Sequence, residues 1–120
     1  MSYPSGIEIP KFASNTLNHL YEIERKLNLH GDPASIQRNV DRIKASFKDE
    51  KLFYEDPMGQ SFNETRTDLE ASISGESTEN LVVVEVIKPI IRAGEQSYSR
   101  VVQKGIVVVK STDQTQEESK

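Results

Sequence analysis

The side chains that most often carry chemistry are few and scattered in this sequence of 120 residues. The two histidines, His19 and His30, fall roughly on one face of an expected helix, with Glu22 near them. A metal site of this kind needs a tighter spacing and more ligands, so we expect exposed histidines and no metal. The absence of cysteine excludes disulfides, thiolate metal sites and a cysteine nucleophile.

Acid–base pairs and phosphate-binding loops are equally hard to find. Neighbouring carboxylates occur at 49–50, 55–56 and 117–118, in polar segments where we expect them to be solvated. The glycines form no phosphate-binding run, and the serines and threonines cluster in loops away from histidine. The sequence therefore predicts a protein that is not an enzyme and needs no cofactor.

Charge and composition narrow the class of partner. The formal net charge is −4 and the pI about 5.2, so the field of the chain repels phosphate backbones, and we expect no nucleic acid as a partner. No apolar run approaches the roughly 20 residues that span a bilayer, so no membrane partner is expected. Residues 1–11 lack the pattern of a signal peptide, which favours a cytoplasmic location.

The stretch that organises the chain is rich in valine and isoleucine. Branched side chains suit the pleated surface of a sheet, so residues 81–87 and 105–109 are predicted strands. A turn is expected at 93–96, where Gly94 can take a positive φ. These elements predict an antiparallel hairpin or meander.

Upstream, apolar residues repeat at intervals of three and four, which indicates two amphipathic helices. Between them, Gly31 is a candidate C-cap, Asp32 an N-cap and Pro33 the first residue of the second helix. The residues predicted to form the apolar seams, and with them a dimer interface, are Leu20, Ile23, Leu27, Val40, Ile43 and Phe47. Two helices cannot enclose a core, so either a second copy completes a four-helix bundle or the helices fold onto the chain's own sheet.

Together these patterns predict an α+β fold: an N-terminal antiparallel helical hairpin that dimerises, followed by a small antiparallel β domain. The expected boundaries are an extended arm at 1–10, the helical hairpin at 11–50, the β domain at 51–111 and a disordered tail at 112–120. The chain is long enough for one compact domain with a helical appendage.

Four blocks of the second half occur in a distinctive order. They are DPMGQSFN at 56–63, Leu69-Glu70-Ala71, VVEVIK at 83–88, and Arg100-Val101-Val102 followed by the valines at 107–109. In order and approximate spacing they resemble the C-terminal β domain of the GrpE family, the nucleotide exchange factors of DnaK-type chaperones. The chain departs from the family pattern at 89–91 and 104–105, and it lacks the family's long N-terminal helix.

The resemblance implies a function without bond chemistry. Family members bind the nucleotide-binding domain of a DnaK-type chaperone and hold its cleft open so that ADP leaves. The partner-binding residues implied are Arg100, Ile87 and Val109, and the helices before the β domain imply a homodimer. The alternatives are a solvated role for Arg100 and ordinary core packing for the other two. Two further hypotheses are an adaptor module without exchange activity and a monomeric domain whose helices cover its own sheet.

Overall fold

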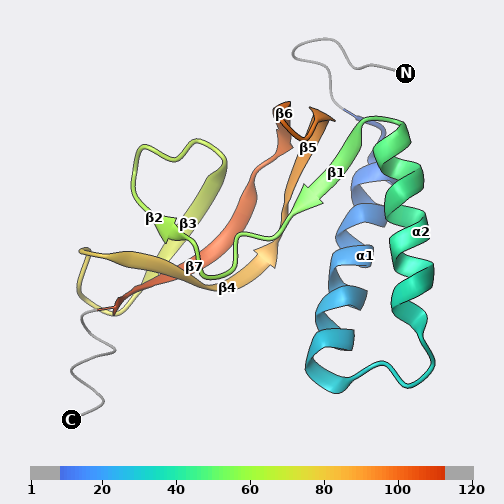
Figure 1. Cartoon of the computed structure of the whole chain (residues 1–120). Coiled ribbons are helices and arrows are strands. Elements are labelled where there is room, and N and C mark those ends of the chain that lie inside the picture. The colour runs from blue at the N-terminus through green and yellow to red at the C-terminus, as the bar shows by residue number, and fades with distance from the viewer. Residues whose placement is uncertain (1–8, 113–120) are drawn as a thin grey trace. The chain divides into compact units, whose positions relative to one another are not determined.

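The computed structural model describes residues 9–112 as two helices and seven strands. In chain order they are α1 (Lys11–His30), α2 (Ile36–Asp49), β1 (Leu52–Glu55), β2 (Ser61–Phe62), β3 (Leu69–Ser74), β4 (Leu81–Lys88), β5 (Ile90–Glu95), β6 (Tyr98–Gln103) and β7 (Gly105–Ser111) (Figure 1). The predicted α+β class is confirmed. Most of the arm predicted at 1–10 and of the tail predicted at 112–120 lies outside the described residues. Neither of the helices in 9–112 combines the length and the apolar character needed to cross a membrane.

The described chain divides into two compact units that are not consecutive segments. Unit 1 comprises residues 9–55 and 91–102, and unit 2 comprises residues 56–90 and 103–112. The strand order is β1-β5-β6 in a three-stranded sheet and β2-β4-β7-β3 in a four-stranded sheet. The helices therefore belong with the three-stranded sheet, and the stretch that the sequence assigns to one β domain contributes to both units.

The helices of unit 1 begin and end at identifiable signals. The N–H of Gly31, which has a φ of 87°, closes α1 as the predicted C-cap. The carboxylate of Asp32 accepts hydrogen bonds from the N–H groups of Ile36 at 2.7 Å and Gln37 at 2.8 Å. The second helix thus starts at Ile36, and its predicted start at Pro33 is wrong. Asp32 caps α2 across an intervening turn, not from the position directly before it.

A shared apolar core joins the two helices of unit 1 to its sheet. Its buried members are Ala13, Leu17, Leu20, Val40, Leu52, Ile91 and Ala93, with Ile9, Leu27, Phe47, Tyr54 and Val102 packed against them. Two of the residues predicted at a dimer interface, Leu20 and Val40, are covered by this core. Two others, Ile23 and Ile43, remain exposed. Within unit 1 the strands therefore cover part of the surface that two isolated helices would leave open.

Unit 2 is built around β7. The predicted strands at 81–87 and 105–109 are confirmed, because β4 and β7 are antiparallel neighbours. On its other side β7 pairs with β3 in parallel, from Leu69 opposite Gly105 to Ser74 opposite Lys110. The prediction of a purely antiparallel β domain is therefore wrong. β4, β5 and β6 intervene in sequence between β3 and β7, and this long connection allows the chain to return in the same direction.

Gly94 takes the positive φ expected of it, but in a different structural setting. The turn predicted at 93–96 lies later, at residues 96–97, and Gly94 is inside β5 with a φ of 128°. Its N–H donates to the backbone oxygen of Lys51 at 2.7 Å. A Cβ at this position would lie 2.7 Å from the backbone oxygen of Tyr98. Only glycine fits this combination of conformation and close approach.

We predict that Gly94→Ala lowers the free energy of unfolding by more than about 2 kcal/mol, because strain at positive φ and a backbone clash add together. The matched control is Gly31→Ala, where φ is 87° but no atom lies within 4 Å of the added Cβ. This control carries backbone strain alone, about 1 to 3 kcal/mol, and should therefore lose less than Gly94→Ala. Urea unfolding followed by circular dichroism measures both variants, and equal losses would contradict the role of the close approach.

Candidate functional site

The histidines lie where the sequence analysis expected them. His19 and His30 are both exposed on α1. Within residues 9–112 no three side chains of histidine, cysteine, aspartate or glutamate gather in a way that could hold a metal ion. A candidate functional site in the described chain therefore has to be sought among its other polar clusters and on its surfaces.

One half-buried polar cluster connects three elements of unit 1. The Glu24 carboxylate on α1 accepts hydrogen bonds from Gln37 Nε2 at 2.7 Å and from Lys44 Nζ at 3.0 Å, both on α2. The Tyr54 hydroxyl on β1 also donates to Glu24. The Lys44 ammonium lies 4.8 Å from the centre of the Tyr54 ring, and Tyr21 meets that ring edge-on at a centroid distance of 5.9 Å.

The protonation of Glu24 reflects this environment. Burial raises the pKa of the carboxyl group, but hydrogen bonds from Tyr54, Gln37 and Lys44 act in the opposite direction, and together they hold the pKa below its ordinary value of 4.5. An ionised carboxylate with three donors is suited to joining elements. It is poorly suited to proton transfer near neutral pH. We therefore interpret the cluster as structural.

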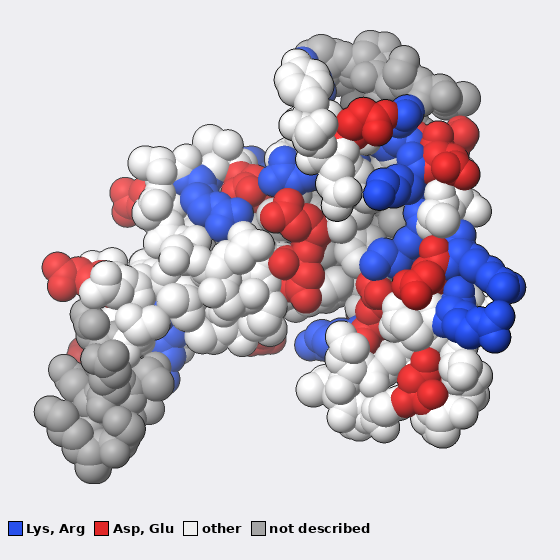
Figure 2. Space-filling model, in the orientation of Figure 1, with Lys and Arg blue, Asp and Glu red and all other residues white. Residues whose placement is uncertain are grey.

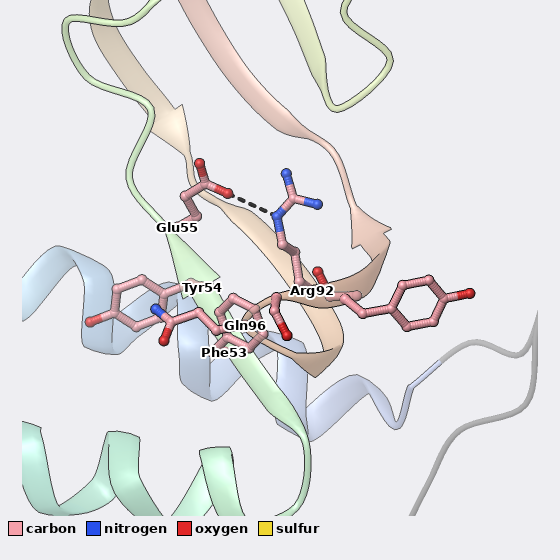
Figure 3. Close-up of a pocket in the computed structure, with 8 residues that line it drawn as sticks. Phe53, Tyr54, Glu55, Arg92 and Gln96 are labelled. Carbon is pink, nitrogen blue, oxygen red and sulfur yellow. Dashed lines mark hydrogen bonds and ion pairs between the residues drawn. The ribbon is translucent and has the colours of Figure 1, made fainter.

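A polar pocket opens beside the strands of the three-stranded sheet. Its volume is about 630 Å³, and its lining residues are Phe53, Tyr54, Glu55, Arg92, Gln96, Ser97, Tyr98 and Ser99 (Figure 3). Arg92 Nε donates to Glu55 Oε1 at 2.8 Å, and the close-up shows these two side chains reaching toward each other from β5 and β1. The one carboxylate of the lining, Glu55, is paired with Arg92, and the other polar groups are suited to recognition by hydrogen bonds.

The β6 strand carries the clearest binding chemistry of unit 1. Tyr98 is 82% exposed, and Arg100 is also exposed. Side chains two residues apart in a strand point to the same face, so the phenol and the guanidinium lie side by side. Neither makes a hydrogen bond or ion pair with another described residue. The sequence analysis identified Arg100 but missed Tyr98, although the Tyr-x-Arg spacing in a strand was a usable signal.

Two irregularities in β4 shape the surface of unit 2. The register with β7 pairs Val83 with Val109, Glu85 with Val108, Val86 with Val107 and Lys88 with Ile106. The two residues passed over, Val84 and Ile87, are 45% and 57% exposed. A β-bulge redirects a side chain in this way and often lies next to a functional site. Ile87 is thus a surface residue, and core packing is not its role in this fold.

Val109 differs from the other two positions that the resemblance implies. It is fully buried in β7, where every second residue from Gly105 to Ser111 is buried. Its side chain therefore packs within unit 2 and is not presented at the surface. Arg100 and Ile87 are exposed, but they belong to different units, so each is considered as a separate surface.

Charges of both signs are mixed on the face of the helices that Figure 2 shows. Figure 2 shows lysine and arginine side chains interspersed with aspartate and glutamate over α1 and α2.

No protein-family model, curated protein or solved structure matches the chain. A function must therefore be argued from the exposed side chains described above.

We predict that Glu24→Gln lowers the free energy of unfolding by about 2 kcal/mol near neutral pH, because charge-assisted hydrogen bonds from Lys44 and its neighbours are weakened. The control is Glu22→Gln, which changes an exposed carboxylate on the same helix. Urea unfolding of both variants and the unchanged chain measures the difference.

The difference should also depend on pH. The folded-state pKa of Glu24 lies below 4.5, so its ionised form stabilises the fold above that pH, and this contribution is lost as the pH falls through the folded-state pKa. The unchanged chain and Glu24→Gln should therefore converge in stability in acid. A gap that stays constant down to the acid transition would contradict this role of Glu24.

Proposed function

We propose that this chain is a GrpE-like co-chaperone of the cytoplasm, which binds the nucleotide-binding domain of a DnaK-type chaperone and promotes release of ADP. It does so without bond chemistry, by binding the open form of the chaperone more tightly than the closed form. A partner shifts a conformational equilibrium only through such a difference in affinity. The residues responsible are surface residues of the two sheets.

The observation that carries the proposal is the convergence of separate sequence blocks on one sheet. Residues 100–102, the first part of the fourth block, lie in β6 of the other sheet. The remaining segments at 56–63, 69–71, 83–88 and 107–109 contribute β2, β3, β4 and β7, in that order. These strands are hydrogen-bonded neighbours in unit 2. Segments with a family-like order along the chain thus share one structural unit, which favours a common origin over a coincidence of valine-rich strands.

The exposure of two implied contact residues adds support. Arg100 projects from β6 without a described partner, and a guanidinium can make two parallel hydrogen bonds to a carboxylate. Ile87 projects from a bulge in β4, where an apolar side chain gains by being covered. Val109 supports β7 from within the unit.

The second part of the proposal is a homodimer through the helices. Unit 1 covers Leu20 and Val40 itself, so the dimer interface reduces to the apolar residues that stay exposed, above all Ile23 and Ile43. Exposed isoleucines on both helices leave an apolar surface that a second copy can cover across a two-fold axis.

The exchange activity predicts faster ADP release. Adding the protein to a DnaK-type chaperone loaded with a fluorescent ADP analogue should accelerate release by about 5- to 150-fold, the usual range for coupling between two binding events. Arg100→Ala and Ile87→Ala should each weaken the effect, because truncation of a binding hot spot costs about 2 kcal/mol. Stopped-flow fluorescence measures the rates.

Two exposed residues of the same types serve as controls, Arg38→Ala on α2 and Ile73→Ala on β3. Both should accelerate release as the unchanged chain does. A folded protein that leaves the release rate unchanged would overturn the exchange function. In that case, binding to the chaperone without acceleration would favour the adaptor alternative.

The dimer predicts a change of mass on substitution. Ile23→Asp combined with Ile43→Asp should halve the mass measured by light scattering, because buried unpaired carboxylates cannot be accommodated at the interface. Leu29→Asp, at a more exposed position of α1, should leave the mass unchanged. A monomeric mass for the unchanged chain over a wide concentration range would refute the dimer.

A further inference from the structure

The free edge of the three-stranded sheet offers backbone groups that the proposed exchange function does not use, although Arg100 of the same strand belongs to both proposals. β6 is the last strand in the order β1-β5-β6, so one side of its backbone has no neighbouring strand among residues 9–112. An edge strand presents N–H and C=O groups with which an extended segment of another chain can pair. The other end of the sheet is different, because β1 lies against α2.

The groups that face outward from β6 follow from the geometry of Gly94. Gly94 lies opposite Ser99, because a Cβ at Gly94 would be 3.0 Å from Ser99 Cα. The N–H of Gly94 donates away from β6, to the backbone oxygen of Lys51. Residues directly opposite in an antiparallel pair either exchange both hydrogen bonds or none. The N–H and C=O of Ser99 therefore point away from β5, toward the open edge.

The composition of β6 does not protect this edge. Natural edge strands are blunted by proline, lysine, inward-pointing charge or a very short length. The sequence of β6, YSRVVQ, spans six residues and contains neither proline nor lysine. Its one charge, on Arg100, is exposed to solvent. An edge of this length without a blocking device is open to strand addition.

The exposed side chains of β6 indicate the chemistry of the segment that it would accept. Tyr98 and Arg100 share one face at a separation of roughly 7 Å, and tyrosine and arginine are both enriched in binding hot spots. The described part of unit 1 has ten lysines and arginines against eight aspartates and glutamates, unlike the chain as a whole, whose net charge is −4. Both features favour an acidic segment, with a carboxylate placed against Arg100.

The opposite face of the strand supplies a second recognition element. Ser99 lines the pocket of about 630 Å³, together with Arg92 and Gln96. Alternate side chains of an added strand would pass this pocket. Recognition by strand addition commonly uses main-chain hydrogen bonds for affinity and side-chain pockets for specificity.

We propose that the free edge of β6 is a docking site for an extended acidic peptide segment of a partner protein, which adds as a fourth strand to the sheet β1-β5-β6. The inference does not rest on a chaperone as the partner or on exchange activity. Main-chain pairing occurs through Ser99, the carboxylate of the segment pairs with Arg100, and the aliphatic part of the segment packs on the Tyr98 ring.

The test uses three fluorescent, end-capped octapeptides on the full chain, with binding measured by fluorescence anisotropy. The first alternates valine and glutamate, the second has glutamine for every glutamate, and the third repeats the first with N-methyl groups on alternate amides. The first peptide should bind. The second should bind about tenfold more weakly, because it lacks the carboxylate that pairs with Arg100, and a tenfold change in affinity corresponds to about 1.4 kcal/mol. The third should not bind measurably, because its methylated amides cannot pair with the main chain of β6. Equal binding of all three, or binding of none, would overturn the proposal.

Variants of β6 test the same contacts from the protein side. Ser99→Pro removes the outward N–H without removing a bond to β5, whereas Ser99→Ala keeps that N–H. The proline variant should bind the acidic peptide with an affinity lower by about tenfold or more, and the alanine variant should bind it as tightly as the unchanged chain does. Arg100→Gln should abolish the preference for glutamate over glutamine.

Circular dichroism confirms that each variant is folded, and if Ser99→Pro unfolds, the N-methylated peptide on the unchanged chain still decides. A folded proline variant that binds normally would overturn strand addition. No chaperone is present in this assay, so its result and that of the ADP-release experiment are independent. Failure of one leaves the other standing.

Discussion

The arrangement of unit 1 depends on the Glu24 carboxylate. Apolar burial supplies most of the free energy that holds helices to a sheet, but it is non-directional and tolerates several arrangements. Glu24 receives donors from Gln37 and Lys44 on α2 and from Tyr54 on β1. A half-buried carboxylate that lost one of these elements would leave polar groups unpaired, which is costly. The cluster therefore fixes which residues of the three elements face each other, and so holds β1, the neighbour of β5, in place.

Unit 2 solves a different problem, because its apolar residues occur in continuous runs. Such runs are typical of strands that are covered on both sides. In β7 the burial alternates residue by residue, with one face fully covered and the other partly exposed. In β4 two bulges break the alternation and turn Val84 and Ile87 outward. The strand β4 therefore presents apolar side chains at the surface, although its continuous apolar sequence is typical of a buried strand.

Local signals in the sequence predicted the two helices and the valine-rich strands β4 and β7, but not the pairing of the strands. The helices followed from three- and four-residue apolar spacing, and Gly31 ended the first of them as expected. Asp32 was recognised as a cap, but its reach over three intervening residues moved the start of α2. The parallel pairing of β3 with β7 was not predictable in this way, because it joins segments that no short-range pattern relates. Gly94 was recognised as a residue that takes a positive φ. Because glycine is needed both in turns and in strands that another backbone approaches closely, the residue type alone did not show that Gly94 lies in a strand.

For the candidate binding residues as well, the sequence gives the residue type but not the exposure of the side chain. The residue type of Arg100 was enough to nominate it, and its exposure on an edge strand is what a binding role requires. Ile87 and Val109 are alike in residue type and strand context, and only the register of β4 against β7 separates a surface residue from a buried one. Register is set by the whole sheet and by its bulges, so it lies beyond what the residue alone reveals. Val84 and Ile87 face solvent because the two bulges of β4 place them there, at a cost in regular pairing with β7.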